Sequence, residues 1–155
     1  MKSILLKFLR TILSGTDHLE ELRTAIANKD GAQVEKIIRS AVQNRAEEHI
    51  QPLMATLCVE EWHSMHEDAV GILQKFGRVE DVSVLERVAN MSLSYLEYDE
   101  HFGLARKATW ALADIGGQAA HQALGRIAES DNSTIAGYAK KRLLNWTGEQ
   151  ERKRN

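Results

Sequence analysis

The sequence predicts an all-α protein, and three observations lead to this class. Among its 155 residues only Pro52 is a proline, so the interruption that proline imposes on helices is rare. Ala, Leu, Glu, Lys and Arg, which favour helices, are abundant, and few stretches alternate as strands do. Helix-stopping and N-capping residue types recur at intervals that fit helices of about 10 to 16 residues. We expect consecutive helices of this length to pair as antiparallel hairpins.

The expected breaks divide the chain into its elements in order. They fall at 14–17, 28–31, 44–45, 77–78, 116–117, 130–133 and 147–148, where Gly, Ser, Thr, Asn or Asp is found. Before the first break, the apolar run 1–13 is interrupted by Lys7 and Arg10. It is therefore too short for an export signal or a membrane span, and we expect an N-terminal capping helix, with a membrane-surface helix as the alternative.

Composition excludes several classes of protein. With 43% hydrophobic and 27% charged residues the chain has enough apolar material for one core, and a formal charge of −2 lacks the basic footprint of a dedicated nucleic-acid binder. The one cysteine, Cys58, cannot form a disulfide within the chain, and the six histidines show no zinc-ribbon spacing. We therefore expect a cytoplasmic protein with no membrane partner, for which nucleic acid is an improbable ligand.

An internal repeat gives the domain organisation. Residues 69–77 match residues 108–116 at an offset of 39, and Ala108 and Leu112 match Ala139 and Leu143 at a further offset of 31. The expected units are 17–45, 46–77, 78–116 and 117–148, each a helix pair, within a single domain 1–148 that is followed by a solvated charged tail, 149–155. Eight aligned positions are expected to be buried: Ala69, Leu73, Leu85, Ala108, Leu112, Leu124, Ala139 and Leu143.

The stretch from Arg106 to Ala120, with Ala-x-x-x-Leu-x-x-Ile-Gly closing its first helix, resembles the helix-turn-helix junction of the HEAT-like repeats first noted in phycobilin lyase subunits. The resemblance covers roughly residues 60–148. It implies an α-α superhelix, a HEAT-like solenoid, of about four helix pairs. Stacked pairs of this kind share a continuous core and present an extended curved surface.

No arrangement typical of an enzyme is found. A Gly-rich phosphate loop, a Gly-x-Ser-x-Gly elbow and a His-Glu-x-x-His motif are all missing. His63 and His66 are three residues apart, and we interpret them as a capping or hydrogen-bonded pair at a helix start, with His63 and Glu67 pointing away from the core. A metal or acid–base site, or a role in partner binding, are the alternatives. Cys58 is expected to be a small buried hydrophobe, and we predict no catalysis, no cofactor and no metal.

Equivalent positions of successive second helices are expected to be neighbours on a strip beside the core. The alignment places Asp68 with Lys107 and Tyr138, Gly71 with Trp110 and Lys141, and Lys75 with Asp114 and Asn145. Trp110 framed by charged residues is typical of an anchor in a protein interface. The alternative is packing between repeats, with Gly71 making room for Trp110 and the charged residues forming salt bridges.

An insert of about eight residues within 92–102 breaks the period between two otherwise matching helices. It contains two tyrosines, Tyr95 and Tyr98, beside the carboxylates of Glu97, Asp99 and Glu100. An acidic, aromatic protrusion of this kind suits a basic partner. The alternative is that Tyr95 and Leu96 seal the hairpin.

Residues 62–68, 95–99 and 107–112 together bear a looser similarity to small HEAT-like immunity proteins of bacterial toxin loci. This resemblance implies a non-enzymatic protein that binds one protein partner and neutralises it, and a basic toxin domain such as a nuclease is a partner of the expected kind. Three alternatives stay open: a general protein-interaction scaffold, a phycobilin lyase subunit, and a DNA glycosylase-like nucleic-acid binder.

Overall fold

The computed structural model describes residues 17–154, which form helices and turns with no strand, and this confirms the all-α prediction. A helix over 17–27 comes first. It is followed by α2 (Gly31–Gln43), α3 (Glu47–Ile50), η1 (Gln51–Leu53), α4 (Met54–Val59), α5 (His66–Phe76), η2 (Val79–Asp81), α6 (Val82–Ala89), η3 (Ser94–Leu96), α7 (Gly103–Ile115), α8 (Gly117–Ile127), α9 (Ser133–Leu144) and α10 (Trp146–Arg154). The predicted N-terminal capping helix, 1–13, lies outside the described residues.

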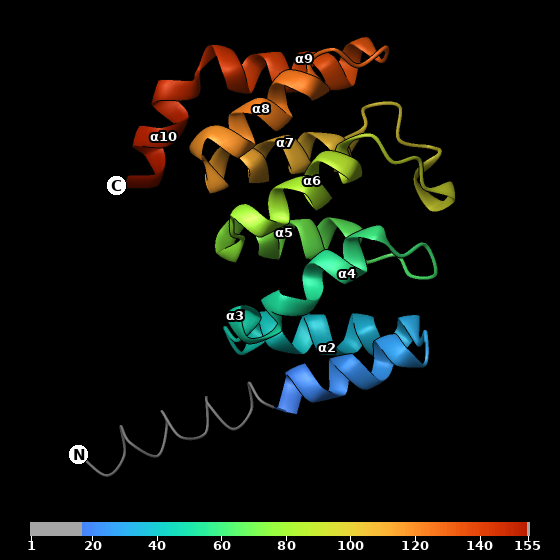
Figure 1. Cartoon of the computed structure of the whole chain (residues 1–155). Helices are drawn as coiled ribbons and strands as arrows, with labels where there is room; N and C mark the ends of the chain where they lie inside the picture. The colour runs from blue at the N-terminus through green and yellow to red at the C-terminus, as the bar shows by residue number, and fades with distance from the viewer. Residues whose placement is uncertain (1–16, 155) are drawn as a thin grey trace, which may run out of the picture.

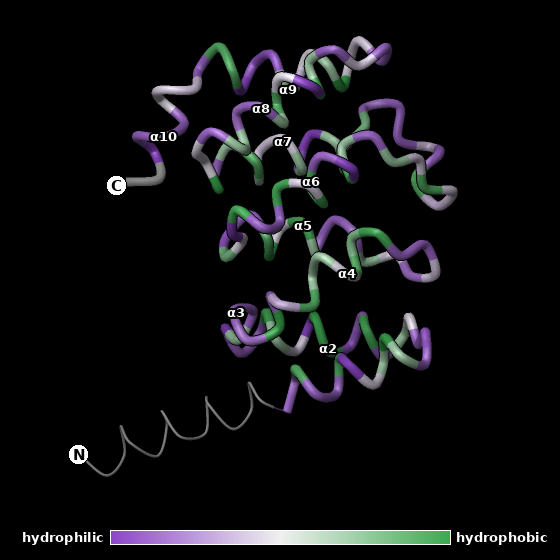
Figure 2. The backbone as a smooth tube through the Cα atoms, in the orientation of Figure 1, coloured by the Kyte–Doolittle hydropathy of each residue, from purple (hydrophilic) through white to green (hydrophobic). Residues whose placement is uncertain are grey.

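From the helix over 17–27 to α9 the helices are stacked along one direction in the order of the sequence, and α10 turns back toward α7 (Figure 1). Within the stack α4 packs on α5, both α5 and α6 pack on α7, and α8 packs on α9. Hydrophobic stretches of these helices face one another inside the stack, whereas α10 is mainly hydrophilic (Figure 2). Within 17–154 no helix has the length and apolar character needed to cross a membrane.

The core contains the positions that the repeat alignment selected. Seven of the eight are fully buried and belong to one hydrophobic cluster, namely Ala69, Leu73, Leu85, Ala108, Leu112, Leu124 and Ala139. Leu143 is only partly buried and packs against the edge of that cluster. Cys58 is also in the core, where burial raises its thiol pKa to about 12, so the thiolate that a nucleophile would need is disfavoured.

Pro52 divides the first helical stretch of the second unit into short pieces. It occupies the start of η1, between α3 and α4, where its missing N–H costs no helical hydrogen bond. A buried polar contact holds this bend, because Gln51 donates from Nε2 to Asp81 Oδ2 at 3.1 Å. Asp81 also accepts the backbone N–H of Arg78 at 2.8 Å, so one carboxylate joins two successive units.

The turn between α7 and α8 depends on glycine. Gly116 has a φ of 73°, in the region that disfavours side chains. A Cβ on Gly116 would also collide with Oε1 of Gln150 on α10. The break predicted at 116–117 is therefore confirmed, and it brings α10 close to the end of α7.

The predicted break at 147–148 and the solvated tail 149–155 are both wrong for the described residues. Residues 146–154 form α10, which packs against α7 and α9. Glu149 is only 6% exposed, because it forms an ion pair with Arg142 of α9. Charged composition suggested a solvated tail, but Glu149 and Arg152 have partners on the preceding helices and the segment is part of the fold.

Candidate protein-binding surface

Trp110, the expected interface anchor, lies beneath two arginines. The guanidinium carbon of Arg142 is 3.6 Å from the centre of the Trp110 ring and that of Arg152 is 5.0 Å away, both within the range of cation–π contacts. The indole is therefore half-buried under α9 and α10 side chains, and its face is occupied by this chain rather than free for a partner. A Cβ added at Gly71 would meet no atom within 4 Å, so Gly71 is not needed to make room for Trp110.

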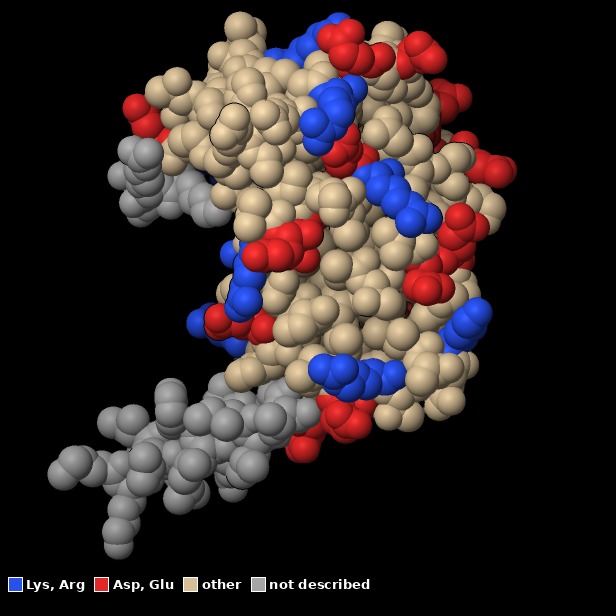
Figure 3. Space-filling model, viewed as in Figure 1, with Lys and Arg blue, Asp and Glu red and all other residues tan. Residues whose placement is uncertain are grey.

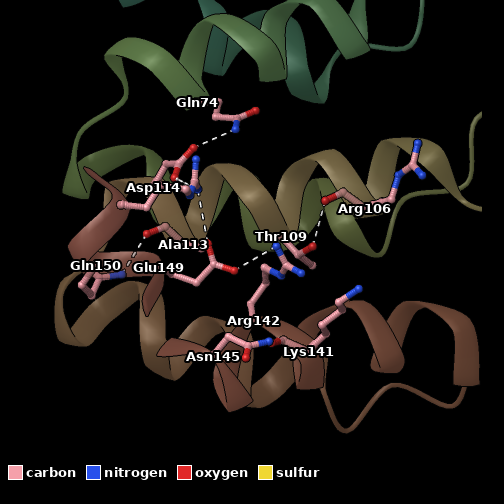
Figure 4. A network of polar contacts seen from close by, with 11 residues as sticks. Gln74, Arg106, Thr109, Ala113, Asp114, Lys141, Arg142, Asn145, Glu149 and Gln150 are labelled. Atoms are coloured by element: carbon pink, nitrogen blue, oxygen red, sulfur yellow. Dashed lines mark hydrogen bonds and ion pairs between the residues drawn. The ribbon is translucent and has the colours of Figure 1, made fainter. Parts of the chain in front are cut away.

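Polar side chains of α7, α9 and α10 form a network of contacts (Figure 4), which includes the two arginines over Trp110. Arg142 and Glu149 form an ion pair at 2.9 Å, with side chains 6% and 7% exposed. Arg152 contacts both Asp114 and Glu149, and Gln74 of α5 donates to Asp114 at 2.7 Å. This network holds α10 against the stack, which favours the packing interpretation of the strip.

The predicted neighbours along the strip are displaced by one residue. Lys107 pairs with Glu67 at 3.0 Å rather than with Asp68, which is exposed. Likewise Asp114 accepts a hydrogen bond from Gln74 and not from Lys75, its aligned residue, which forms an ion pair with Glu47 at 3.2 Å. Helices pack with the side chains of one between those of the next, so a residue does not face its direct equivalent.

The displacement is regular along the stack. Glu67–Lys107, Gln74–Asp114 and Glu86–Arg126 are each separated by 40 residues, one more than the repeat offset. The prediction that Glu67 points away from the core holds only in part, because it is half-buried in this ion pair. Lys141 is exposed on α9 and its side chain is not part of this series.

A buried pair of imidazoles anchors the first part of the insert. His63 and His66 stack with ring centres 4.3 Å apart and are 6% and 0% exposed, so the prediction that His63 points away is wrong. The reason is that α5 begins at His66, which leaves His63 in the preceding turn. His63 Nδ1 accepts the backbone N–H of Met65 at 3.0 Å, and His63 Nε2 lies 2.8 Å from the carbonyl oxygen of Leu57. These contacts confirm that the histidine is hydrogen-bonded, as the sequence predicted.

Tyr95, which belongs to the insert, forms a hydrogen bond with His66 of this pair. Its hydroxyl lies 2.9 Å from His66 Nδ1, and His66 Nε2 lies 2.6 Å from Glu60 O, so the neutral imidazole donates to the carbonyl and accepts from Tyr95. Burial, together with the neighbouring His63, lowers the pKa of His66 to about 4. Burial raises the pKa of Tyr95 to about 12, so both groups keep the protonation state that this hydrogen bond needs at neutral pH. Tyr95 is thus a sealing residue, as the alternative interpretation expected.

Two further contacts fix the end of the insert. Asp99 accepts the backbone N–H groups of His101 at 3.0 Å and Gly103 at 2.5 Å, and these bonds lower its pKa. Tyr138 of α9 donates its hydroxyl to His101 O at 2.5 Å. The residues between these anchors are accessible: Tyr98 is 81% exposed, and Glu97 and Glu100 are exposed beside it.

A groove of about 870 Å³ lies between the insert and the turn that joins α8 to α9. Its apolar lining includes Leu93, Leu96, Leu104, Ala105 and Ile135. Five carboxylates also line it: Glu97, Asp99 and Glu100 from the insert, and Glu129 and Asp131 from the turn. None of the described residues that line the groove is Lys, Arg or His. Acidic side chains gather along this edge of the molecule (Figure 3).

The structure thus divides the predicted site residues into two groups. Glu97, Asp99 and Glu100 share the groove, and Tyr98 is exposed on the same insert. Lys107, Trp110 and Asp114 belong to the packing contacts of the strip. Sequence reasoning missed Glu129 and Asp131, although 129–133 lies at a predicted break and is rich in polar residues. What it could not supply was the proximity of that turn to the insert.

Among the described residues no group of three or more His, Cys, Asp or Glu could hold a metal ion. Comparison of the chain with models of protein families, with curated proteins and with solved structures gives no significant match.

Proposed function

We propose that this chain is a HEAT-like α-α superhelix of about four helix pairs that binds one protein partner. The helices stack in sequence order, and polar contacts recur at a separation of 40 residues between successive units. Both features are typical of repeat proteins, in which each unit packs on its neighbours and the stack presents extended surfaces. In this proposal the chain has no catalytic activity, cofactor or metal of its own, and it acts in the cytoplasm.

The observation that carries the proposal is the anchored, acidic insert. Tyr95, Asp99 and His101 tie it to the body of the protein, while Tyr98 is 81% exposed. A binding segment that is already fixed loses little conformational entropy when a partner binds. An exposed tyrosine among carboxylates combines contact area with attraction for a basic surface. The partner is therefore a basic protein, and the looser similarity to immunity proteins favours a toxin domain such as a nuclease.

The proposal is tested by isolating the partner from cells that produce this chain. An affinity-tagged chain is captured, its bound molecules are identified by mass spectrometry, and the complex is reconstituted from purified components. We expect one protein in a 1:1 complex, and we expect co-production of this chain to relieve the toxicity of that protein. A pigment or nucleic acid bound stoichiometrically in place of a protein would contradict the proposal, as would turnover of a substrate by the chain alone.

Variants of the insert locate the binding surface on the reconstituted complex. Tyr98→Ala is expected to weaken binding by about 2 kcal/mol, the loss that defines an interface hot spot. The matched control is Tyr138→Phe, which removes a hydroxyl at the back of the insert and leaves the exposed ring of Tyr98 in place. Equal losses for both variants would mean that the conformation of the insert, rather than the Tyr98 contact, decides the affinity.

A further inference from the structure

The groove beside the insert combines an apolar floor with an acidic rim. Leu93, Leu104 and Ala105 are each 5% exposed and form part of the floor. The rim carboxylates come from two segments that are about 30 residues apart in the sequence, the insert and the α8–α9 turn. An apolar floor attracts an aliphatic or aromatic side chain, whereas the rim attracts cations.

The charge of the groove selects among possible occupants. Its five carboxylates face no Lys, Arg or His among the described lining residues. The backbone N–H groups of Gly103 and His101 lower the pKa of Asp99, with smaller effects of the His101 and Arg106 charges, so this carboxylate is partly compensated. Glu97, Glu100, Glu129 and Asp131 take part in no ion pair within the described part of the chain. A cationic occupant would relieve their mutual repulsion, and an acidic or nucleic-acid occupant would increase it.

Both walls of the groove are held in place without a partner. The insert is fixed by Tyr95 and Asp99, and the opposite wall is fixed by Asn132, whose side chain accepts the N–H groups of Thr134 and Ile135 at the start of α9. A volume of about 870 Å³ lies within the range of roughly 300–1,000 Å³ that is usual for ligand sites. The groove is partly open to solvent. A chain segment can therefore enter it without any rearrangement of the protein.

We infer that this groove receives a segment of a basic partner protein in which one or two leucine-like side chains are flanked by Lys or Arg. The apolar side chains would lie on the floor, and the cationic ones would reach the rim carboxylates on both walls. This inference rests on the proposed function and names the part of the partner that the chain recognises. It is an example of recognition in which apolar anchors give affinity and flanking charges give the orientation.

The test uses a synthetic peptide with two leucines, three residues apart, between pairs of lysines, labelled with fluorescein. Binding is followed by fluorescence anisotropy, and its location by amide chemical shifts of the ¹⁵N-labelled chain. We expect chemical-shift changes at residues 90–105 and 129–135, and we expect affinity to fall with added salt because the rim charges are exposed. Replacing both leucines by serine should weaken binding about tenfold or more, because serine cannot bury the same apolar surface on the floor.

Two triple variants give matched charge controls. Glu97, Glu100 and Glu129 changed to Lys should weaken binding of the leucine peptide about tenfold or more, because the rim then repels it. Glu48, Glu61 and Glu80 changed to Lys alter the net charge equally at exposed sites away from the groove, and should change the affinity less than about twofold. Circular dichroism and thermal unfolding of both variants confirm that the fold is retained.

The inference is overturned if the chemical shifts change elsewhere, if the serine peptide binds as well as the leucine peptide, or if both triple variants behave alike. Its failure is distinguishable from failure of the proposed function. A captured partner whose affinity is the same for both triple variants would preserve the proposed function and exclude the groove. Peptide binding at the groove without any captured protein partner would support the groove as a binding site and contradict the proposed function.

Discussion

Leu112 and Leu144 are the same residue type in opposite surroundings. Leu112 is 0% exposed in the centre of the core, and Leu144 is 86% exposed at the end of α9. We predict that Leu112→Ala lowers the free energy of unfolding by about 2–5 kcal/mol, because it leaves a cavity among packed helices. Leu144→Ala should change it by no more than about 0.5 kcal/mol. Urea unfolding of both variants measures the difference, and a loss at Leu112 as small as that at Leu144 would refute the repeat alignment.

His66 gives a prediction for the dependence of stability on pH. Its pKa is about 4 in the folded protein, against 6.5 for an unperturbed histidine, because the buried ring resists protonation. Above pH 6.5 neither the folded nor the unfolded state binds this proton. As the pH falls from 6.5 to 4 only the unfolded state binds it, so the free energy of unfolding decreases by about 3 kcal/mol in total.

The comparison that isolates this effect is His66→Gln, which cannot titrate. Urea unfolding of the wild type and of H66Q at intervals between pH 7 and pH 4 is expected to give a steeper loss for the wild type. Carboxylates titrate in both proteins near the acidic end, so the difference between the two curves is the relevant quantity. Parallel curves would mean that His66 is protonated as easily in the folded state as in the unfolded one.

At the scale of an element, α10 is held by a buried ion pair. Glu149 lies 2.9 Å from Arg142, and both are nearly inaccessible to solvent. We predict that Glu149→Gln lowers the free energy of unfolding by about 3–5 kcal/mol, because Arg142 keeps a buried charge without its carboxylate. The control is Glu151→Gln on the exposed side of the same helix, which should cost no more than about 0.5 kcal/mol.

The double variant Arg142→Met with Glu149→Leu tests whether the unpaired charge of Arg142 causes the loss of stability in E149Q. If the charge left unpaired causes the loss, removing both charges should recover a large part of it, since apolar pairs often replace buried ion pairs at little cost. A double variant that is less stable than E149Q would mean that the network around Trp110, rather than the single pair, holds α10. Thermal unfolding followed by circular dichroism separates the two outcomes.

At the scale of the whole molecule, the stack predicts unequal protection of its helices. α7 packs against α5, α6, α8, α9 and α10, whereas α2 lies near one end of the described stack, where it contacts α3 and the helix over 17–27. Local opening requires less free energy where fewer elements must separate. We predict that amide hydrogens of α7 exchange slowest and that those of α2 exchange faster, as measured by hydrogen–deuterium exchange with mass spectrometry.

A pair of variants tests whether the ends of the stack open independently. Val34 and Leu112 are both 0% exposed, one in α2 and one in α7. Val34→Ala is expected to speed exchange mainly in residues 17–43, whereas Leu112→Ala should speed it throughout the described stack. Equal acceleration everywhere by both variants would indicate one all-or-none unit and contradict the nearest-neighbour behaviour of repeat proteins.

The sequence by itself determined the helical class, most of the breaks and the buried positions. These are properties of local composition and of spacing: Gly116 must stop α7, and Leu73, Leu112 and Leu124 recur where a helix faces the core. It also indicated the insert, because a change in the repeat period is visible without coordinates. Each of these features depends on residues that are close together in the chain.

Only the tertiary structure decided which charged side chains meet. Trp110 is covered by Arg142, one residue beyond its aligned neighbour Lys141, and by Arg152 of α10, which is folded back on α7. A one-residue displacement between stacked helices likewise changed the partners of Lys107 and Asp114. The groove depends on the approach of the insert to the α8–α9 turn, and such long-range proximity is set by how whole helices pack rather than by local preference.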